Sequence, residues 1–332
     1  MRFDPKQVKN ILVVRNDRFG EFLLNIPAFR ALKETFPNST ITAVIDPYLK
    51  ELARGIEYID AVIEWKKQKH AFMHKIKLIR LLRKKKIEIA VMLNPSKEFN
   101  LIAFLAGIRI RVGYDRKWAF LLTHKIKDEK YLALKHEVEY NLDLVKLIGA
   151  ETRNKALALM TNEDLTRKLF KGSDLCDKEM LVALHPFTSD PFKQWPYERF
   201  RDLAVRIVQQ YKIKVVIIGG IEHFQYSLEL FRDAPEGVIN LTGRTTLEQL
   251  SVLLTKCLVL ITGDSGPMHL ACAVNTAVIA LFRNDVVAKS PRRWGPWGER
   301  NTIIQKSLLS DISVDQVFAA AEALINGKRT PH

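Results

Sequence analysis

Residues 257–269, Cys-Leu-Val-Leu-Ile-Thr-Gly-Asp-Ser-Gly-Pro-Met-His, contain a short apolar run, a turn and the start of a helix. The run Cys257–Thr262 is apolar almost throughout, which is typical of a strand buried on both faces of a parallel sheet. Pro267 suits a first helical turn because its nitrogen carries no hydrogen that would stay unpaired. Since Gly266 has no side chain, an anion can approach the N–H groups of this helix start. The stretch predicts an α/β fold with an anion site at the carboxyl end of a strand.

The same alternation of apolar strands and amphipathic helices extends along the whole chain of 332 residues. In the first half we expect strands at Asn10–Arg15, Thr40–Ile45, Ala61–Trp65, Ile87–Leu93 and Arg109–Gly113, with helices at Phe22–Phe36 and Phe72–Arg83. The polar interval Glu151–Asp177 is the best candidate for a linker. After it we expect strands at Lys178–Pro186, Lys214–Gly220, Val238–Leu241, Cys257–Thr262, Ala277–Phe282 and Asn301–Gln305, with helices at Tyr197–Tyr211, Glu222–Phe231, Thr246–Leu254 and Val314–Ile325.

Continuous apolar strands separated by helices indicate parallel sheets that are covered on both faces. We therefore expect two doubly wound, Rossmann-like domains, residues 1–160 and 161–332, facing each other across a cleft. In such sheets, ligands bind at the carboxyl ends of the strands.

The net charge of +15 is unevenly distributed. Residues 1–160 contain 31 Lys and Arg against 18 Asp and Glu, whereas residues 161–332 contain 21 against 19. A polyanion or an anionic membrane surface would therefore meet the first half first. Part of the excess lies in Trp65–Lys86, where Phe72, Ile76 and Ile79 have helical spacing and cations crowd the other face. This segment is a solvated helix face, a surface for anionic lipid headgroups or, ranked lower, a nucleic-acid surface. It lacks the interleaved aromatic side chains of a nucleic-acid surface.

Targeting, membrane and metal signals are weak or absent. No apolar signal core follows Met1, and no apolar run approaches the roughly 20 residues of a membrane helix. The three cysteines are scattered, which favours a reducing compartment, so we expect a cytoplasmic protein. His70 and His74 share a helix face but lack a third ligand, and no Asp-x-Asp pair is present, so we expect no bound metal. No Walker A or Gly-x-Gly-x-x-Gly pattern occurs, which argues against ATPase and dinucleotide-binding functions.

Two further strand-to-helix loops carry reactive side chains. In the loop Arg15–Glu21, Gly20 allows close approach of a ligand. Glu21 would lie in the first helical turn, where it either complements the helix dipole or acts as a general base on a substrate hydroxyl. The loop Leu184–Pro196 is either an ordinary capped loop or a phosphate site formed by Thr188, Ser189 and Lys193.

The turn Gly263–His269 also has alternative explanations. Asp264 or Ser265 could simply cap the following helix. Its Gly-Asp-Ser-Gly sequence also occurs around the nucleophile of trypsin-like proteases. We reject that function because those enzymes are all-β, whereas this turn connects a buried strand to a helix.

Taken together, these segments resemble glycosyltransferase family 9, the heptosyltransferases of lipopolysaccharide core synthesis, over nearly the whole chain. The motifs that carry the resemblance are Arg15-Asn16-Asp17-Arg18-Phe19-Gly20-Glu21 with Pro27, Arg111-Val112-Gly113-Tyr114 with His136, His185-Pro186 to Lys193-Gln194-Trp195-Pro196, Leu241-Thr242-Gly243-Arg244-Thr245-Thr246-Leu247, and Asp264-Ser265-Gly266-Pro267-Met268-His269. The resemblance implies a GT-B fold, in which the first domain binds the acceptor and the second binds a nucleotide-activated sugar, typically ADP-heptose. It also implies an inverting transfer without a bound metal or other cofactor.

The resemblance assigns roles to individual residues as well. Glu21 stands where the family has its catalytic Asp and keeps the carboxylate on a longer side chain. Lys193 is the second residue implied in catalysis, and Arg18 and Gly20 lie on the acceptor side. The residues implied in donor binding are Thr188, Ser189, Lys193, Glu222, Thr245, Asp264, Ser265, Gly266, Pro267 and His269.

These assignments predict a glycosyltransferase that moves a sugar onto a lipopolysaccharide core or a related glycan. Its partners would be a nucleotide-diphosphate sugar and an anionic glycolipid, but no nucleic acid. The basic first domain would contact the cytoplasmic face of the inner membrane as a peripheral protein. Two other functions stay open, namely a nucleotide-sugar epimerase or hydrolase of similar fold, and a catalytically silent nucleotide-sugar-binding protein.

Overall fold

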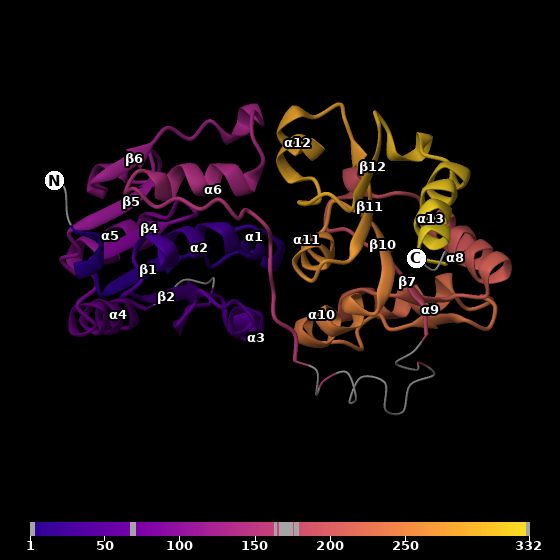
Figure 1. The fold of residues 1–332 in the computed structure, drawn as a ribbon, viewed down its shortest axis with the longest axis horizontal. Coiled ribbons are helices and arrows are strands. Elements are labelled where there is room, and N and C mark those ends of the chain that lie inside the picture. Colours follow the sequence, from indigo (N-terminus) through magenta and orange to yellow (C-terminus); the bar gives the residue numbers. More distant parts are fainter. Residues whose placement is uncertain (1–3, 67–70, 163–164, 166–174, 176–178, 330–332) are drawn as a thin grey trace. The chain divides into compact units, whose positions relative to one another are not determined.

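The computed structural model describes residues 4–66, 71–162, 165, 175 and 179–329. The chain divides into two compact units, Met1–Leu159 and Met160–His332 (Figure 1). This division falls one residue before the expected boundary after residue 160. Much of the predicted linker Glu151–Asp177 lies outside the described residues. None of the described helices is both long and apolar enough to cross a membrane.

The first unit is a parallel six-stranded sheet of order β3-β2-β1-β4-β5-β6. Its strands are β1 (Asn10–Val14), β2 (Thr40–Ile45), β3 (Ala61–Glu64), β4 (Ile89–Met92), β5 (Ile110–Tyr114) and β6 (His124–Ile126). Its helices are α1 (Phe19–Leu23), α2 (Ile26–Thr35), α3 (Lys50–Arg54), α4 (Phe72–Lys84), α5 (Lys97–Leu105) and α6 (Glu137–Lys146). The central strands β1 and β4 are almost completely buried, as their apolar sequences predicted. The short and partly polar strand β6 was not predicted, because its sequence has no apolar run.

Two helices replace the single helix that we expected over Phe22–Phe36. Pro27 lies in the first turn of α2 and has no N–H to continue the hydrogen-bond ladder of α1, so the helix breaks before it. The side-chain amide of Asn25 instead donates to the carbonyl oxygens of Glu21 at 2.5 Å and Phe22 at 3.2 Å. This break limits α1 to Phe19–Leu23, with Glu21 in its first turn.

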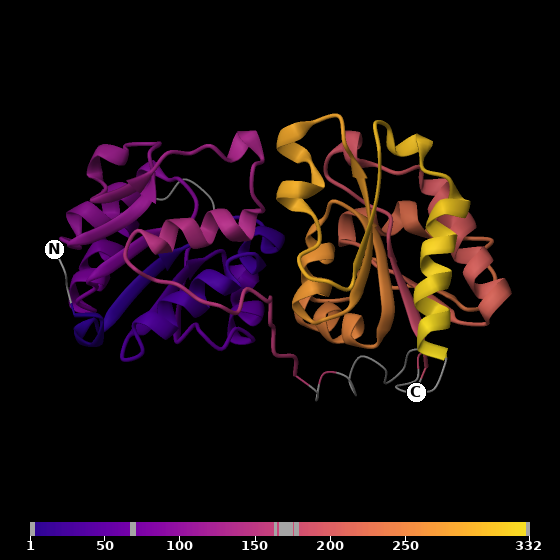
Figure 2. The ribbon, with the colours of Figure 1, turned by 45° about the horizontal axis from the view of Figure 1, so that its top comes forward.

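The second unit repeats the arrangement with the order β12-β11-β10-β7-β8-β9, again all parallel. Its strands are β7 (Leu181–His185), β8 (Lys214–Ile217), β9 (Val238–Asn240), β10 (Cys257–Gly263), β11 (Ala277–Arg283) and β12 (Asn301–Lys306). Its helices are α8 (Tyr197–Tyr211), α9 (Phe224–Leu230), α10 (Leu247–Thr255), α11 (Gly266–Ala273), α12 (Pro291–Trp294) and α13 (Val314–Arg329). Helices α8 and α13 pack together on one face of this sheet, and α10 and α11 pack together on the other (Figure 2).

Both sheets reverse their strand order beside their first strand. In the first unit, β1 lies between β2 and β4, and in the second unit β7 lies between β8 and β10. The connections on either side of such a switch point leave in opposite directions, and ligands of open parallel sheets bind there, beyond the carboxyl ends of the strands. We therefore expect ligand sites at the loops after β1, β4, β7 and β10.

Candidate functional site

A buried arginine at the end of β1 holds two carboxylates. Arg15 is 2% exposed and directly follows β1. Its Nε donates to Oδ1 of Asp17 at 2.8 Å, and its Nη2 donates to Oε2 of Glu21 at 2.7 Å. Its Nη1 donates to the carbonyl oxygen of Leu93, next to the end of β4, at 3.1 Å. These three contacts fix the Glu21 carboxylate at the switch point of the first unit.

The surroundings of Glu21 suit a group that exchanges protons near neutral pH. Its side chain is 29% exposed in the first turn of α1. Burial raises the pKa of the Glu21 carboxyl to about 7, while Arg15 opposes the rise and Asp17 adds to it. Burial alone would lower the pKa of Arg15, but the two carboxylates raise it, so Arg15 stays charged. A carboxylate whose pKa lies near the working pH is an effective general base.

Arg18 and Gly20, the two residues expected on the acceptor side, differ in their exposure to solvent. Arg18 is exposed at the N-cap position of α1, and its side chain makes no capping bond. Gly20 is buried inside α1, which begins at Phe19. The expectation that Gly20 lies in an open loop is therefore wrong. A buried helical glycine presents little of its backbone to a ligand.

In the second unit, an ion pair joins the loops after β7 and β10. Lys193 ends the short 3-10 turn η5 (Pro191–Lys193), and its Nζ pairs with Oδ2 of Asp264, directly after β10. Their side chains are 24% and 11% exposed. Gly263 favours this close approach, because a Cβ there would lie 3.2 Å from the carbonyl oxygen of Lys193 and the loop would have to shift slightly. Two motifs that are distant in sequence thus form one site.

The start of α11 lacks the side-chain cap that we considered. Ser265 is the N-cap residue, but its side chain makes no capping bond. Its hydroxyl instead lies 2.9 Å from that of Thr262, which lies 3.1 Å from Nδ1 of His185. Burial lowers the pKa of His185 to about 3, so this buried ring is neutral. Because no side chain caps this helix start, an anion can bind there.

Helix α11 begins at Gly266, slightly earlier than the expected start near Pro267 or Met268. Pro267 occupies its first turn, and Pro267 and His269 are buried. These two residues pack inside the second unit. Gly266 has no side chain at the start of the helix.

The other residues expected to bind the donor lie on loops along the same sheet edge. The Thr188 hydroxyl accepts a hydrogen bond from the Asp190 amide at 3.2 Å, and Ser189 is exposed beside it. Glu222 is exposed in the turn after β8, and Thr245 is half-buried in the loop after β9. Strands β10, β7, β8 and β9 are neighbours in that order. The loops that follow them therefore share one edge of the sheet.

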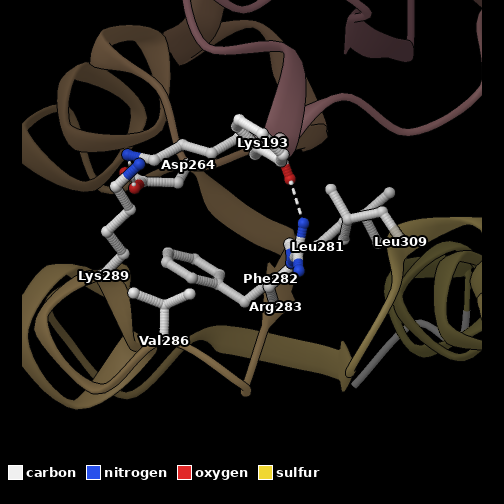
Figure 3. Close-up of a pocket in the computed structure, with 9 residues that line it drawn as sticks. Lys193, Asp264, Leu281, Phe282, Arg283, Val286, Lys289 and Leu309 are labelled. Carbon is white, nitrogen blue, oxygen red and sulfur yellow. Dashed lines mark hydrogen bonds and ion pairs between the residues drawn. The ribbon is translucent and has the colours of Figure 1, made fainter.

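A cavity of about 260 Å³ lies beside Lys193 and Asp264 (Figure 3). It is lined by Phe192, Lys193, Asp264, Leu281, Phe282, Arg283, Val286, Lys289 and Leu309. Its walls are mainly apolar. The end of β11 and the segment after it contribute two cations, Arg283 and Lys289, each paired with a carboxylate. Lys289 pairs with Asp190 at 2.7 Å, and Nε of Arg283 donates to Asp285 at 2.9 Å. In Figure 3 the side chains of Lys193 and Lys289 extend toward the same side of the cavity as Asp264.

The part of this cavity formed by Arg283 and Lys289 was not predicted from the sequence. A signal was available, because the polar segment that contains them follows a predicted buried strand at the same sheet edge. As for metals, the described residues contain no group of three or more His, Cys, Asp or Glu side chains that could hold an ion. His74 lies on α4, whereas His70 lies outside the described residues.

Known proteins match this chain over most of its length. The family model described as Glycosyltransferase family 9 (heptosyltransferase) matches residues 75–317. Lipooligosaccharide heptosyltransferase 2 of Haemophilus influenzae is 25% identical over 318 residues, which cover 89% of this chain and 88% of that protein. The range matched by the family model begins after the loop Arg15–Glu21, so the role of this loop stays a prediction.

Solved structures confirm the expected fold. The glycosyl transferase family 9 protein of Veillonella parvula has a TM-score of 0.86 at 22% identity, covering 98% of this chain and 99% of that one. Escherichia coli ADP-heptose lps heptosyltransferase II has a TM-score of 0.84 at 22% identity, covering 97% and 100%. The two parallel six-stranded sheets with their helices thus form the expected GT-B type of fold.

Proposed function

This chain belongs to glycosyltransferase family 9, and we propose that it transfers heptose from ADP-heptose to a lipopolysaccharide core or a related glycan, with inversion and without a bound metal. The observation that carries the proposal is the position of the Lys193 amine beside Asp264 and the uncapped start of α11. A partly exposed amine beside a helix start without a side-chain cap suits a diphosphate. ADP-heptose also appears in the name of the Escherichia coli relative of known structure.

On the donor side, the diphosphate competes with Asp264 for the Lys193 amine. Lys193 and the amides at the start of α11 then stabilise the negative charge that grows on the departing diphosphate, in the place of a metal ion. Asp264, released from Lys193, accepts a hydrogen bond from a sugar hydroxyl. Thr188 and Ser189 donate hydroxyl hydrogens to the phosphates. Glu222 and Thr245, further along the edge, contact the nucleoside.

On the acceptor side, Glu21 is the general base. It removes the proton from an acceptor hydroxyl while that oxygen attacks the anomeric carbon. The bond from this carbon to the diphosphate breaks on the opposite face, so a single displacement inverts the configuration. Arg15 orients the Glu21 carboxylate and prevents its pKa from rising further. The exposed Arg18 attracts the anionic groups of the acceptor.

The charge of the first half supports a lipid-linked, anionic acceptor. Residues 1–160 carry the large excess of Lys and Arg over Asp and Glu. Anionic lipids attract such a surface at short range. We therefore propose that the enzyme works as a peripheral protein at the cytoplasmic face of the inner membrane.

A two-step experiment tests the proposed reaction. ADP-, GDP-, UDP- and TDP-sugars are first screened by thermal shift, and the donor that binds is then incubated with heptose-deficient lipopolysaccharide in the presence of EDTA. We expect ADP-heptose to stabilise the protein and the acceptor to gain one heptose in mass, with the anomeric configuration inverted by NMR. Retention of configuration would contradict the role of Glu21.

The same experiment separates the two alternative functions. Free or isomerised sugar without acceptor would indicate a hydrolase or an epimerase. Donor binding without product across a panel of acceptors would indicate a silent binding protein.

A further inference from the structure

Exposed apolar side chains of the first unit gather around one short turn. The 3-10 turn η3 (Ala119–Leu121) follows β5, and Trp118 and Phe120 are 45% and 77% exposed. Their ring centroids lie 6.3 Å apart. At the end of α5, Phe104 and Leu105 are also exposed. We call the surface formed by Phe104, Leu105, Trp118 and Phe120 the aromatic edge.

Arg111 joins the two parts of the aromatic edge. Its guanidinium carbon lies 5.5 Å from the ring centroid of Phe104, and its Nε donates to the carbonyl oxygen of Leu121 at 2.6 Å. Helix α5 also packs directly on η3. The exposed rings are therefore parts of one continuous surface.

The backbone is strained where it exposes Trp118. Lys117 and Trp118 have φ angles of 52° and 66°, in the left-handed region that non-glycine residues avoid. The carbonyl oxygen of Lys117 accepts a hydrogen bond from the Asn100 side chain at 3.0 Å. The Nζ of Lys117 donates to the carbonyl oxygen of Pro95 at 3.2 Å. The strain is thus held by specific contacts, and it keeps a large aromatic side chain out of the core.

Cations that lack carboxylate partners surround the aromatic edge. Residues 97–127 contain seven Lys and Arg against two Asp and Glu. Within the described part of the chain, Lys97, Arg109 and Lys117 form no ion pair, and the Lys97 amine lies 6.0 Å from the ring centroid of Trp118.

Helix α4 extends this cationic surface, because it packs beside α5. Lys75 pairs with Glu98 at 3.1 Å, and Arg83 donates to the carbonyl oxygen of Leu105 at 2.6 Å. The exposed Lys77, Arg80 and Lys84 of α4 likewise form no ion pair with described residues.

The part of the aromatic edge at Trp118 lies on the same sheet edge as the Glu21 loop. Oδ1 of Asn16, in the loop after β1, lies 3.5 Å from Nδ2 of Asn94, in the loop after β4. Pro95, the next residue, accepts the bond from Lys117 after β5. The loops after β1, β4 and β5 are therefore neighbours at one edge of the sheet.

We propose that the aromatic edge docks the first unit on an anionic lipid bilayer. Trp118 and Phe120 enter the headgroup region, where aromatic side chains are favoured, and the neighbouring cations lie beside anionic headgroups. Neither signal alone anchors a peripheral protein firmly, whereas the two together do. The inference rests on the proposed function in one respect: docking here brings the Glu21 edge to a lipid-linked acceptor.

Vesicle co-sedimentation of the full chain, without donor or acceptor, tests the docking. We expect binding to phosphatidylcholine vesicles that contain phosphatidylglycerol and little binding to pure phosphatidylcholine. The double variant Trp118→Ala/Phe120→Ala should lower partitioning at least about tenfold. Lys97→Gln and Lys117→Gln should each lower it about fivefold. The control Leu308→Ala, which removes an apolar side chain that is 50% exposed in the second unit, should bind as the wild type does.

A fluorescence experiment locates the contact without disturbing the surface. Vesicles with brominated acyl chains should quench the wild-type tryptophan fluorescence. Trp118→Phe should keep its binding and lose most of this quenching. Equal binding to neutral and anionic vesicles, unchanged quenching in Trp118→Phe, or binding to RNA without binding to vesicles would overturn the proposal. Transfer to a detergent-dispersed acceptor is measured separately, so failure of docking and failure of transfer are distinguishable.

Discussion

The loops after β1 and β7 occupy equivalent places in two sheets of the same topology, yet their charges are arranged in opposite ways. In the first unit, the arginine is buried, and it directs the carboxylate of Glu21 outward. In the second unit, the more exposed partner is the cation Lys193, and the carboxylate of Asp264 lies deeper. The strand order thus fixes where a ligand can bind, and the side chains decide which charge the ligand meets.

The burial of the two cations also separates their roles. The side chain of Arg15 is 3% exposed and bonds to three groups, whereas that of Lys193 is 24% exposed and pairs with one carboxylate. A buried guanidinium held by three hydrogen bonds serves as a fixed support. A half-exposed amine can exchange its partner for a phosphate. We therefore expect changes at the first site to affect proton transfer and changes at the second site to affect the donor.

The largest expected effect follows from removing the base. Glu21→Gln should lower kcat by about 100-fold to 10,000-fold, because the amide cannot accept the acceptor proton. Donor affinity, measured by calorimetry, should stay within about twofold of the wild-type value. The matched control is Glu34→Gln, an exposed glutamate on α2, which should leave both quantities unchanged. Near-normal turnover in Glu21→Gln would remove Glu21 from the mechanism.

The second-largest expected effect follows from removing the Lys193 amine in the second unit. Lys193→Gln should weaken donor binding about 10-fold to 100-fold, because a charge-assisted bond to the diphosphate is lost. The value of kcat should fall as well, since the same amine stabilises the leaving group. Lys306→Gln, at an exposed position of β12, provides the control. Unaltered donor affinity in Lys193→Gln would contradict the comparison of the two sites.

The pH dependence sharpens the role of Glu21. A base must be deprotonated to act, and burial raises the pKa of Glu21 to about 7. The rate constant kcat/KM should therefore rise with pH through about 7 and level off above it. Below the midpoint it should fall about tenfold per pH unit. The residual rate of Glu21→Gln should lack this midpoint, and an unchanged profile in that variant would assign the titration to another group.

The smallest effect tests the close approach of the loops after β7 and β10. In Gly263→Ala the new Cβ would lie 3.2 Å from the carbonyl oxygen of Lys193, so the loop must shift slightly. We expect a loss of donor affinity of a few fold and a slightly lower Tm. Gly327→Ala is the control, because nothing lies within 4 Å of a Cβ at that helical position. Equal behaviour of the two variants would show that Lys193 does not depend on this packing.

The sequence predicted those features that depend on local patterns. Buried strands such as Cys257–Thr262 are apolar on both faces, so their positions followed directly from the sequence. The single helix over Phe22–Phe36 was wrong because apolar spacing continues through Pro27, although its missing N–H ends the ladder. A separate error placed Gly20 in a loop, because α1 begins at Phe19, before the expected helix start.

Contacts between distant loops could not be predicted in this way. The sequence around Arg15 does not indicate its hydrogen bond to Leu93, because only the pairing of β1 with β4 brings the two residues together. The position of Arg283 and Lys289 after a predicted buried strand indicated the sheet edge, but not which loop they would lie beside. Their place beside Lys193 follows only from the position of β11 in the sheet.

Hydrogen–deuterium exchange with and without the bound nucleotide sugar tests most directly the division of roles between the two sites. The donor should slow exchange in peptides that cover residues 186–196 and 262–270, the loop after β7 and the start of α11, since their amides then face the diphosphate. Peptides that cover residues 15–25 should keep their exchange rates until the acceptor is added. Protection of residues 15–25 by the donor alone, without protection at the start of α11, would contradict this account.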